Sequence, residues 1–343
     1  MVDDTSTVAQ YHGEELKTMK KALITGVAGF VGSHLSEYLL SQKISVYGFF
    51  HPSHSIENIL HLKDKINLVP CDILDKKNLQ PQTSEINPDY VFHLAAFSSP
   101  ADSFKNPKDT LTNNILGQLN LLEGLLRAKS KAQILIVGSG DEYGDIEKKY
   151  LPADEQTPLA PTSPYAVSKV AQDMLGLQFF LHSRLHIIRV RPFNHIGPRQ
   201  SRAFVVPAFA SQIAALEKEG HGTIKVGNLE SWRDFTDVRD MVRAYLLALE
   251  KGVPGEVYNI GSGKPIKISD LLNKLISLSK AKIEVDQDKN LFRPVDIKKI
   301  YCNFSKFQSQ TGWTPKIPLS KTLSDTIKYE RDKLKSEVRN SKY

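Results

Sequence analysis

The chain has 343 residues, enough for one large domain or two coupled ones, and its 41% hydrophobic and 24% charged residues are ordinary for a globular protein. The formal net charge of +7 suits an anionic substrate, but no nucleic-acid recognition motif accompanies it. No apolar run approaches the ~18–20 residues that a membrane span needs. Two cysteines, Cys71 and Cys302, cannot form a disulfide framework, which favours the cytoplasm.

The two ends of the chain differ from the rest. Residues 1–18 carry acidic residues and no apolar core, so we expect a disordered N-terminal extension and not a signal peptide. The stretch after Pro318 is rich in Lys and Arg and predicts a solvated helix, with residues 331–343 as a tail.

Between residues 19 and 190, short apolar runs alternate with helical patterns. Continuous β-branched runs separated by helices are typical of a parallel sheet covered on both faces, which predicts an α/β fold with a doubly wound sheet. The expected strands are 21–25, 44–50, 66–72, 90–96, 133–139 and 186–192, and the expected helices are 30–42, 107–128 and 164–182.

After about residue 191 turns become denser and the elements shorter. Residues 191–233 and 263–330 predict a smaller C-terminal α/β lobe at the carboxyl ends of the sheet, and 234–262 is expected to return to the first domain. The expected elements here are helices 204–218, 239–250 and 268–280 and strands 223–226 and 256–260.

A glycine-rich turn joins the first strand to the first helix. In the run Gly26-Val27-Ala28-Gly29-Phe30-Val31-Gly32, the first glycine permits a tight turn and the second lets a pyrophosphate approach the backbone. The third lets the helix pack closely on the strand. The helix N-terminus at Phe30 and Val31 offers amide donors to phosphate, so we expect a dinucleotide here.

The end of the second strand bears on which nicotinamide cofactor binds. NAD sites usually place an acidic residue there, but this chain has Phe49-Phe50-His51 and no acid before Glu57. That absence favours NADP(H), with NAD(H) as the alternative. His51 and Ser53 are candidate donors to a 2′-phosphate. Four more residues at strand ends are expected along the cofactor, namely Asp72, Ile73, Ala95 and Ala96.

Three residues form a candidate catalytic set. Tyr165 and Lys169 lie one helical turn apart on the same face, and a nearby ammonium lowers the pKa of a phenol, which can then act as a general acid or base. Lys169 can also hydrogen-bond the nicotinamide ribose. Ser139, at the end of the fifth strand, can donate to a substrate carbonyl. No metal site is expected.

With these motifs the chain resembles the extended short-chain dehydrogenase/reductase family across residues 19–330. The resemblance implies a Rossmann domain that binds the cofactor, a smaller substrate lobe and a homodimer joined by a four-helix bundle. The bundle helices would be 107–128 and 164–182.

Polar residues on turns of the second lobe indicate a nucleotide diphosphate, because arginine matches pyrophosphate oxygens with a bidentate fork. An acid there can accept from a ribose or a guanine amino group. The candidate substrate-binding residues are Asn194, Lys225, Arg233, Arg293 and Asp296.

The segments 191–200, 204–214 and 227–245 are similar to the branch of the family that acts on GDP-linked sugars. The implied reaction is reduction of the carbon-4 ketone of a GDP-4-keto-6-deoxyhexose to a product such as GDP-rhamnose. Ser139 would polarise the carbonyl, Tyr165 would protonate the alkoxide and Lys169 would tune Tyr165.

Three alternatives remain open. Dehydratases of the family use a Glu two residues before the tyrosine that Tyr143 matches. The shorter Asp141 holds that position, with Glu142 beside it, so a GDP-mannose 4,6-dehydratase is the second hypothesis. Gly140 departs from the serine often found in reductases. A UDP- or dTDP-sugar epimerase or dehydratase is third. The non-enzyme alternative is a protein that binds NADP(H) without turnover. The chain retains Ser139, Tyr165 and Lys169, which argues against it.

Overall fold

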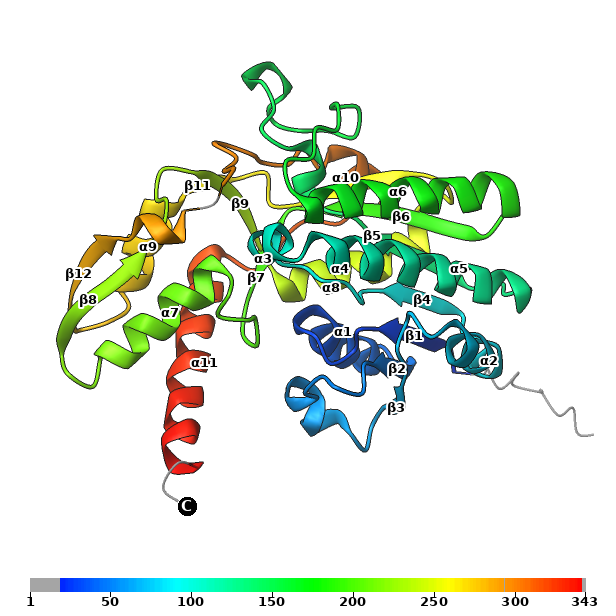
Figure 1. The fold of residues 1–343 in the computed structure, drawn as a ribbon, viewed down its shortest axis with the longest axis horizontal. Coiled ribbons are helices and arrows are strands. Elements are labelled where there is room, and N and C mark those ends of the chain that lie inside the picture. The colour runs from blue at the N-terminus through cyan, green and yellow to red at the C-terminus, as the bar shows by residue number, and fades with distance from the viewer. Residues whose placement is uncertain (1–18, 293, 341–343) are drawn as a thin grey trace, which may run out of the picture.

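The computed structural model describes residues 19–292 and 294–340, so the expected N-terminal extension, Arg293 and the last three residues lie outside the described part. At its centre is a seven-stranded sheet in the order β10-β6-β5-β4-β1-β2-β3 (Figure 1). Every neighbouring pair in it is parallel, which confirms the doubly wound α/β fold. Its strands are β1 (Lys21–Thr25), β2 (Ser45–Phe50), β3 (Asn67–Pro70), β4 (Tyr90–His93), β5 (Gln133–Val137), β6 (His186–Pro192) and β10 (Val257–Ile260).

Helices cover both faces of this sheet (Figure 1). One face carries α1 (Phe30–Ser41) and α8 (Val238–Lys251), and the other carries α2 (Lys76–Ile86), α5 (Gly117–Arg127) and α6 (Pro164–Ser183). The start of α6 is fixed locally. The Ser163 side chain accepts from the Ala166 amide, and Pro164 occupies the first turn, where a missing N–H costs nothing.

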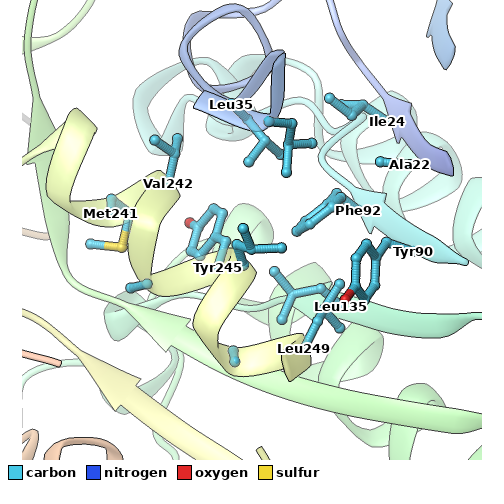
Figure 2. Packing of buried hydrophobic residues seen from close by; sticks show 14 of the residues in the cluster. Ala22, Ile24, Leu35, Tyr90, Phe92, Leu135, Met241, Val242, Tyr245 and Leu249 are labelled. Atoms are coloured by element: carbon cyan, nitrogen blue, oxygen red, sulfur yellow. The ribbon is translucent and has the colours of Figure 1, made fainter. Parts of the chain in front are cut away.

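The larger core lies between the sheet and the α1/α8 layer. Figure 2 shows Tyr245 and Leu249 of α8 near Phe92 of β4 and Leu135 of β5, with Leu35 of α1 beside them. Because α8 and β10 follow the second-lobe segments in the chain but pack on the central sheet, that lobe is built from two separate stretches of sequence.

The second lobe stands at one end of the sheet (Figure 1). Its core lies among α7 (Val205–Leu216), α9 (Ile268–Ile276) and α11 (Leu319–Asn340). Two small sheets complete it: β8 (His221–Val226) with β12 (Lys282–Gln287), and β9 (Trp232–Asp237) between β7 (Asn194–Ile196) and β11 (Pro265–Lys267).

The last helix differs from the expected solvated helix and tail. Leu323 and Ile327 of α11 are buried in the second-lobe core, and buried Glu330 pairs with Arg202 at 2.7 Å. The helix also continues to Asn340, through most of the segment 331–343. One face of α11 is therefore part of the lobe.

The segment expected as one helix over 107–128 has three parts. A turn of π-helix, η2 (Thr112–Leu116), separates α4 (Pro107–Leu111) from α5. The remaining short elements are α3 (Pro100–Lys105), α10 (Ser305–Thr311), η1 (Glu57–Leu62), η3 (Gly140–Tyr143), η4 (Lys148–Tyr150) and η5 (Lys289–Leu291). Across the described ranges, no helix combines the length and apolar character needed to cross a bilayer.

Candidate active site

The glycine turn lies where β1, β2 and β4 end. Gly26 has φ +73°, and a Cβ there would be 2.9 Å from the Ala95 backbone. A Cβ on Gly32 would be 2.4 Å from the Gly26 carbonyl oxygen, so only glycine lets α1 approach the turn this closely. The Gly26 amide donates to the Phe49 carbonyl at 2.9 Å, which ties the turn to β2.

The N-terminus of α1 opens from this turn. Its N-cap residue is Gly29, which has no side chain to cap the helix, and the first turn contains no acidic residue. The amides of Phe30, Val31 and Gly32 belong to that first turn. Such a helix end offers N–H donors and the positive end of the helix dipole to an anion.

A cavity of 670 Å³ lies against the turn. Its lining includes seven of the residues expected to bind the cofactor: Gly26, Gly29, His51, Asp72, Ile73, Ala95 and Ala96. Leu94, Phe97, Thr112 and Asn113 also line it and were not expected, because they lie on a loop and a π-helical turn without a sequence motif. A cavity of this size, lined by a glycine turn next to an uncapped helix end, fits a dinucleotide.

Imidazole and hydroxyl groups gather at the end of β2. His51 Nδ1 lies 2.7 Å from Ser53 Oγ, and the His51 and His54 rings are 4.9 Å apart. His51 Nε2 is 3.7 Å from an Asp72 carboxylate oxygen on the neighbouring strand end. His51, Ser53 and His54 all line the cavity, together with Ser55.

The structure brings Ser139, Tyr165 and Lys169 together. Ser139 follows β5, and Tyr165 lies in the first turn of α6; they are each 9% exposed, and their side chains are hydrogen-bonded to each other. Lys169 is 5% exposed, and its Nζ lies 5.9 Å from the centre of the Tyr165 ring. A serine, a phenol and an ammonium thus meet at the carboxyl end of the sheet.

The electrostatics of this set differ from the expected lowering of the phenol pKa. Burial raises the pKa of Tyr165, and the nearby Asp141 raises it further. Burial lowers the pKa of Lys169 to about 8, against a smaller opposing effect of Glu142. Tyr165 is therefore held as a proton donor, which is the state that a reduction needs.

The two candidate acids lie in different surroundings. Asp141 is partly exposed, and its amide donates to Ser139 Oγ at 3.1 Å. Glu142 is 0% exposed, and its Oε1 accepts from the Ser139 amide at 2.7 Å. Glu142 thus faces the protein interior, and the expectation that it touches substrate does not agree with its burial.

The substrate-lobe candidates are scattered more widely. Asn194 and Lys225 are exposed on β7 and β8. Arg233 is 8% exposed and pairs with Asp296 at 2.8 Å, while its NH1 donates to the Ile297 carbonyl. Asp296 also accepts hydrogen bonds from Asn228 and Ser231, so this carboxylate makes its contacts with other residues of the lobe.

A buried charge network beneath the site was not expected from the sequence. Asp173 of α6 accepts from Arg189 at 2.6 Å and from Arg191 at 2.6 and 2.8 Å. Arg191 NH1 donates to the Tyr143 hydroxyl at 3.1 Å. The signal in the sequence was the pair of arginines in an otherwise apolar central strand, which requires a buried partner.

The π-helical turn also contributes to the site. Asn114 exchanges two hydrogen bonds with the Phe97 backbone, at 2.8 and 3.1 Å, and its amide donates to Ser168 Oγ at 2.9 Å. Ser168 precedes Lys169, so Asn114 links the cavity wall to α6, the helix that carries Tyr165 and Lys169. Within residues 19–292 and 294–340, no group of three or more His, Cys, Asp or Glu side chains is arranged to hold a metal ion.

The doubly wound sheet, the glycine turn and the Ser139–Tyr165–Lys169 set define an extended short-chain dehydrogenase/reductase. The family model described as GDP-mannose 4,6 dehydratase matches residues 23–326, and the chain belongs to that family.

Among known relatives, the GDP-6-deoxy-D-mannose reductase of Pseudomonas aeruginosa is 34% identical over 306 residues, which cover 89% of this chain and 95% of the relative. The structure of RMD from P. aeruginosa complexed with NADPH superposes with a TM-score of 0.79 at 32% identity and covers 92% of this chain and 100% of that one. A UDP-glucose 4-epimerase from Thermotoga maritima, solved with UDP-glucose, has a TM-score of 0.82 at 31% identity and covers 92% and 99%.

Proposed function

We propose that the protein reduces the carbon-4 ketone of GDP-4-keto-6-deoxy-D-mannose with NADPH, giving a GDP-6-deoxyhexose such as GDP-D-rhamnose. The observation that carries this proposal is the protonated Tyr165 beside Ser139 at the carboxyl end of the sheet whose other strand ends line a dinucleotide-sized cavity. The similarity to a GDP-6-deoxy-D-mannose reductase over most of both chains supports the choice of substrate.

The residues divide the chemistry between them. The glycine turn, with Gly26 and Gly29 at the cavity, would hold the dinucleotide, whose nicotinamide would supply the hydride for the carbonyl carbon. The Ser139 hydroxyl, hydrogen-bonded to Tyr165, would donate to the carbonyl oxygen, and Tyr165 would give its proton to the alkoxide that forms. The Lys169 ammonium, 5.9 Å from the centre of the Tyr165 ring, would stabilise the negative charge left on the Tyr165 phenolate.

The direct test mixes purified protein, NADPH and freshly prepared GDP-4-keto-6-deoxymannose and follows the absorbance of reduced nicotinamide, with GDP-mannose as the control. Stoichiometric loss of NADPH with the keto sugar alone supports the reductase. An unchanged absorbance with the keto sugar, in protein that binds NADPH, contradicts it.

For the cofactor, we infer a preference for NADPH over NADH. The absence of an acid at the end of β2 supports it, because a carboxylate there would repel a 2′-phosphate. His51, Ser53 and His54 are suited to donate to that phosphate. The relative solved with NADPH agrees with this preference.

A second candidate is GDP-mannose 4,6-dehydration, favoured by one observation. Asp141 is partly exposed and lies close enough to Tyr165 to raise its pKa, so an acid is present beside the catalytic phenol. If GDP-mannose gives a keto sugar in the control, Asp141 takes an elimination role. Asp141→Asn would then abolish that product.

We also propose a homodimer through α5 and α6. These helices lie side by side on the outer face (Figure 1) and expose large apolar side chains, namely Leu126, Val167, Met174 and Leu181. Exposed apolar groups on two neighbouring helices favour burial against a second copy. Light scattering should give twice the chain mass, and Leu181→Glu should shift it towards the monomer.

We place the protein in the cytoplasm, which the free, buried Cys71 and Cys302 support.

A further inference from the structure

Glu142 is a fully buried carboxyl group within one turn of the catalytic serine. It lies in η3, and its side chain points into the interior beneath the turn. Its Oε1 accepts from the Ser139 amide at 2.7 Å, while Ser139 Oγ accepts from the Asp141 amide at 3.1 Å. These reciprocal contacts form a capping box around Ser139.

The neighbouring glycine makes room for this contact. A Cβ on Gly138 would lie 2.2 Å from Glu142 Oε1, so any larger residue would displace the carboxyl group. The absence of a side chain at Gly138 therefore leaves the space that the Glu142 carboxyl group occupies. The Glu142 side chain therefore holds the turn after β5 that carries Ser139, in addition to the backbone hydrogen bonds of that turn.

The second oxygen of Glu142 connects the turn to the catalytic helix. Oε2 lies 3.2 Å from Arg191 Nε, whose hydrogen is directed at Asp173 Oδ2, 2.8 Å away. Asp173 belongs to α6, one turn after Lys169. Glu142, Arg191 and Asp173 thus link the Ser139 turn to the helix that carries Tyr165 and Lys169.

Protonation of Glu142 leaves the contact with Ser139 intact. Burial raises the pKa of Glu142 to about 8, and Asp173 raises it further, while Arg191, the Ser139 amide and Lys169 oppose the shift. A neutral carboxyl group keeps a carbonyl oxygen that accepts from an amide. Glutamine has the same shape and the same acceptor, so it imitates this neutral form.

We propose that Glu142 is a positioning residue, whose Oε1 holds the Ser139 amide and thereby fixes the Ser139 hydroxyl relative to Tyr165. The consequence for turnover rests on the proposed reductase function. The contact itself can be measured without turnover.

The first experiment is hydrogen exchange by mass spectrometry on the segment 133–145 in the wild type, Glu142→Ala and Glu142→Gln. Exchange at Ser139 should accelerate at least tenfold in Glu142→Ala and stay near the wild-type rate in Glu142→Gln. Glu155→Ala is the matched control, because Glu155 Oε1 also accepts from a backbone amide, that of Asn259 at 2.7 Å, but does not contact Ser139. Equal protection of Ser139 in all variants overturns the proposal, whatever the enzyme's substrate.

The second experiment measures kcat and KM with NADPH and GDP-4-keto-6-deoxymannose. We expect Glu142→Ala to lower kcat about 10- to 100-fold with little change in KM for NADPH, and Glu142→Gln to restore most of it, because a small displacement of a catalytic group has effects of this order. In the Ser139→Ala background, Glu142→Ala should cost little more. A glutamine variant as slow as alanine, or additive effects of the two substitutions, would overturn the assignment.

If Glu142→Ala does not fold, Glu142→Asp takes its place. It keeps the carboxyl group but withdraws it by one methylene, so it should lose both the protection of Ser139 and the rate. A wild type that binds NADPH but reduces no keto sugar contradicts the proposed function and leaves the exchange result to decide on Glu142.

Discussion

Lys169 Nζ donates to the Val137 carbonyl oxygen at 2.8 Å, which holds the ammonium at the end of the strand that leads to Ser139. The titratable groups around it are Glu142 of η3, Tyr165 on its own helix and the buried His93 of β4, whose pKa falls to about 3 through burial and the Lys169 charge. His93 is therefore neutral, and Lys169 is the cation of the site.

This arrangement predicts how activity depends on pH. Because burial lowers the pKa of Lys169 to about 8, the ammonium is present below that pH and is lost above it. Tyr165, whose pKa is raised, keeps its proton over the same range. We expect kcat/KM to fall about tenfold per pH unit above about 8, as for loss of one essential proton. Lys169→Arg keeps its charge over this range, so its kcat/KM should not fall above pH ~8. The same fall in the wild type and in this variant would show that another group titrates there.

Replacing Tyr165 by Phe removes the proton donor and preserves the ring. We expect kcat to fall about 10²–10⁴-fold, the usual contribution of a general acid. NADPH affinity, measured by fluorescence titration, should stay within a factor of about three, because the phenol is not among the residues that line the cavity at the glycine turn. Near-normal turnover in this variant would remove Tyr165 from the mechanism.

Gly32→Ala tests the close approach of α1 to the glycine turn. The added Cβ would lie 2.4 Å from the Gly26 carbonyl oxygen, so the helix must move. We expect a loss of about 1–3 kcal/mol in the free energy of unfolding, together with weaker NADPH binding. Gly29→Ala is the milder comparison, since its Cβ would be 3.2 Å from the same oxygen. Equal melting temperatures for both variants would contradict this view of the turn.

Asp173→Asn tests the buried charge network. The substitution leaves Arg189 and Arg191 without their shared carboxylate in the interior, and breaking a buried pair in this way costs about 3–5 kcal/mol. Urea denaturation measures the loss. Asp332→Asn, which breaks the exposed pair with Lys328 on α11, should leave the denaturation midpoint unchanged. Similar midpoints for the two variants would show that the network contributes no more than a surface pair.

Substitution of the imidazoles at the end of β2 tests cofactor selection. His51→Ala and His54→Ala should each raise KM for NADPH about tenfold, the worth of one hydrogen bond to a charged group. KM for NADH should hardly change, because that cofactor lacks the 2′-phosphate. His221→Ala, an exposed histidine in the second lobe, serves as the control. A parallel rise for both cofactors would assign these residues to the adenosine instead.

The sequence predicted the features that depend on local pattern. The apolar runs of the central strands and the glycine turn have signals within a few residues, and β6 begins and ends where the pattern does. Helix α2 was not predicted, because Pro81 lies inside it and its residues are mostly polar. The pairing of Arg233 with Asp296 and the burial of Glu142 depend on segments far apart in the chain or on the direction of one side chain, and neither leaves a local signal.

The π-helical turn at Thr112–Leu116 makes this site sensitive to the length of the chain as well as to its composition. A π-turn accommodates one residue more than the α-helix around it. Deleting a single residue there would restore a regular helix and leave α4 and α5 in nearly the same relative orientation, because the π-turn holds the extra residue within one turn. The change would fall on the turn itself: the side chains of Thr112, Asn113 and Asn114 would shift, which would alter the cavity wall and the contacts of Asn114 with Phe97 and Ser168. Relatives that differ by one residue at this point should therefore differ in the shape of the cavity even where their motifs agree.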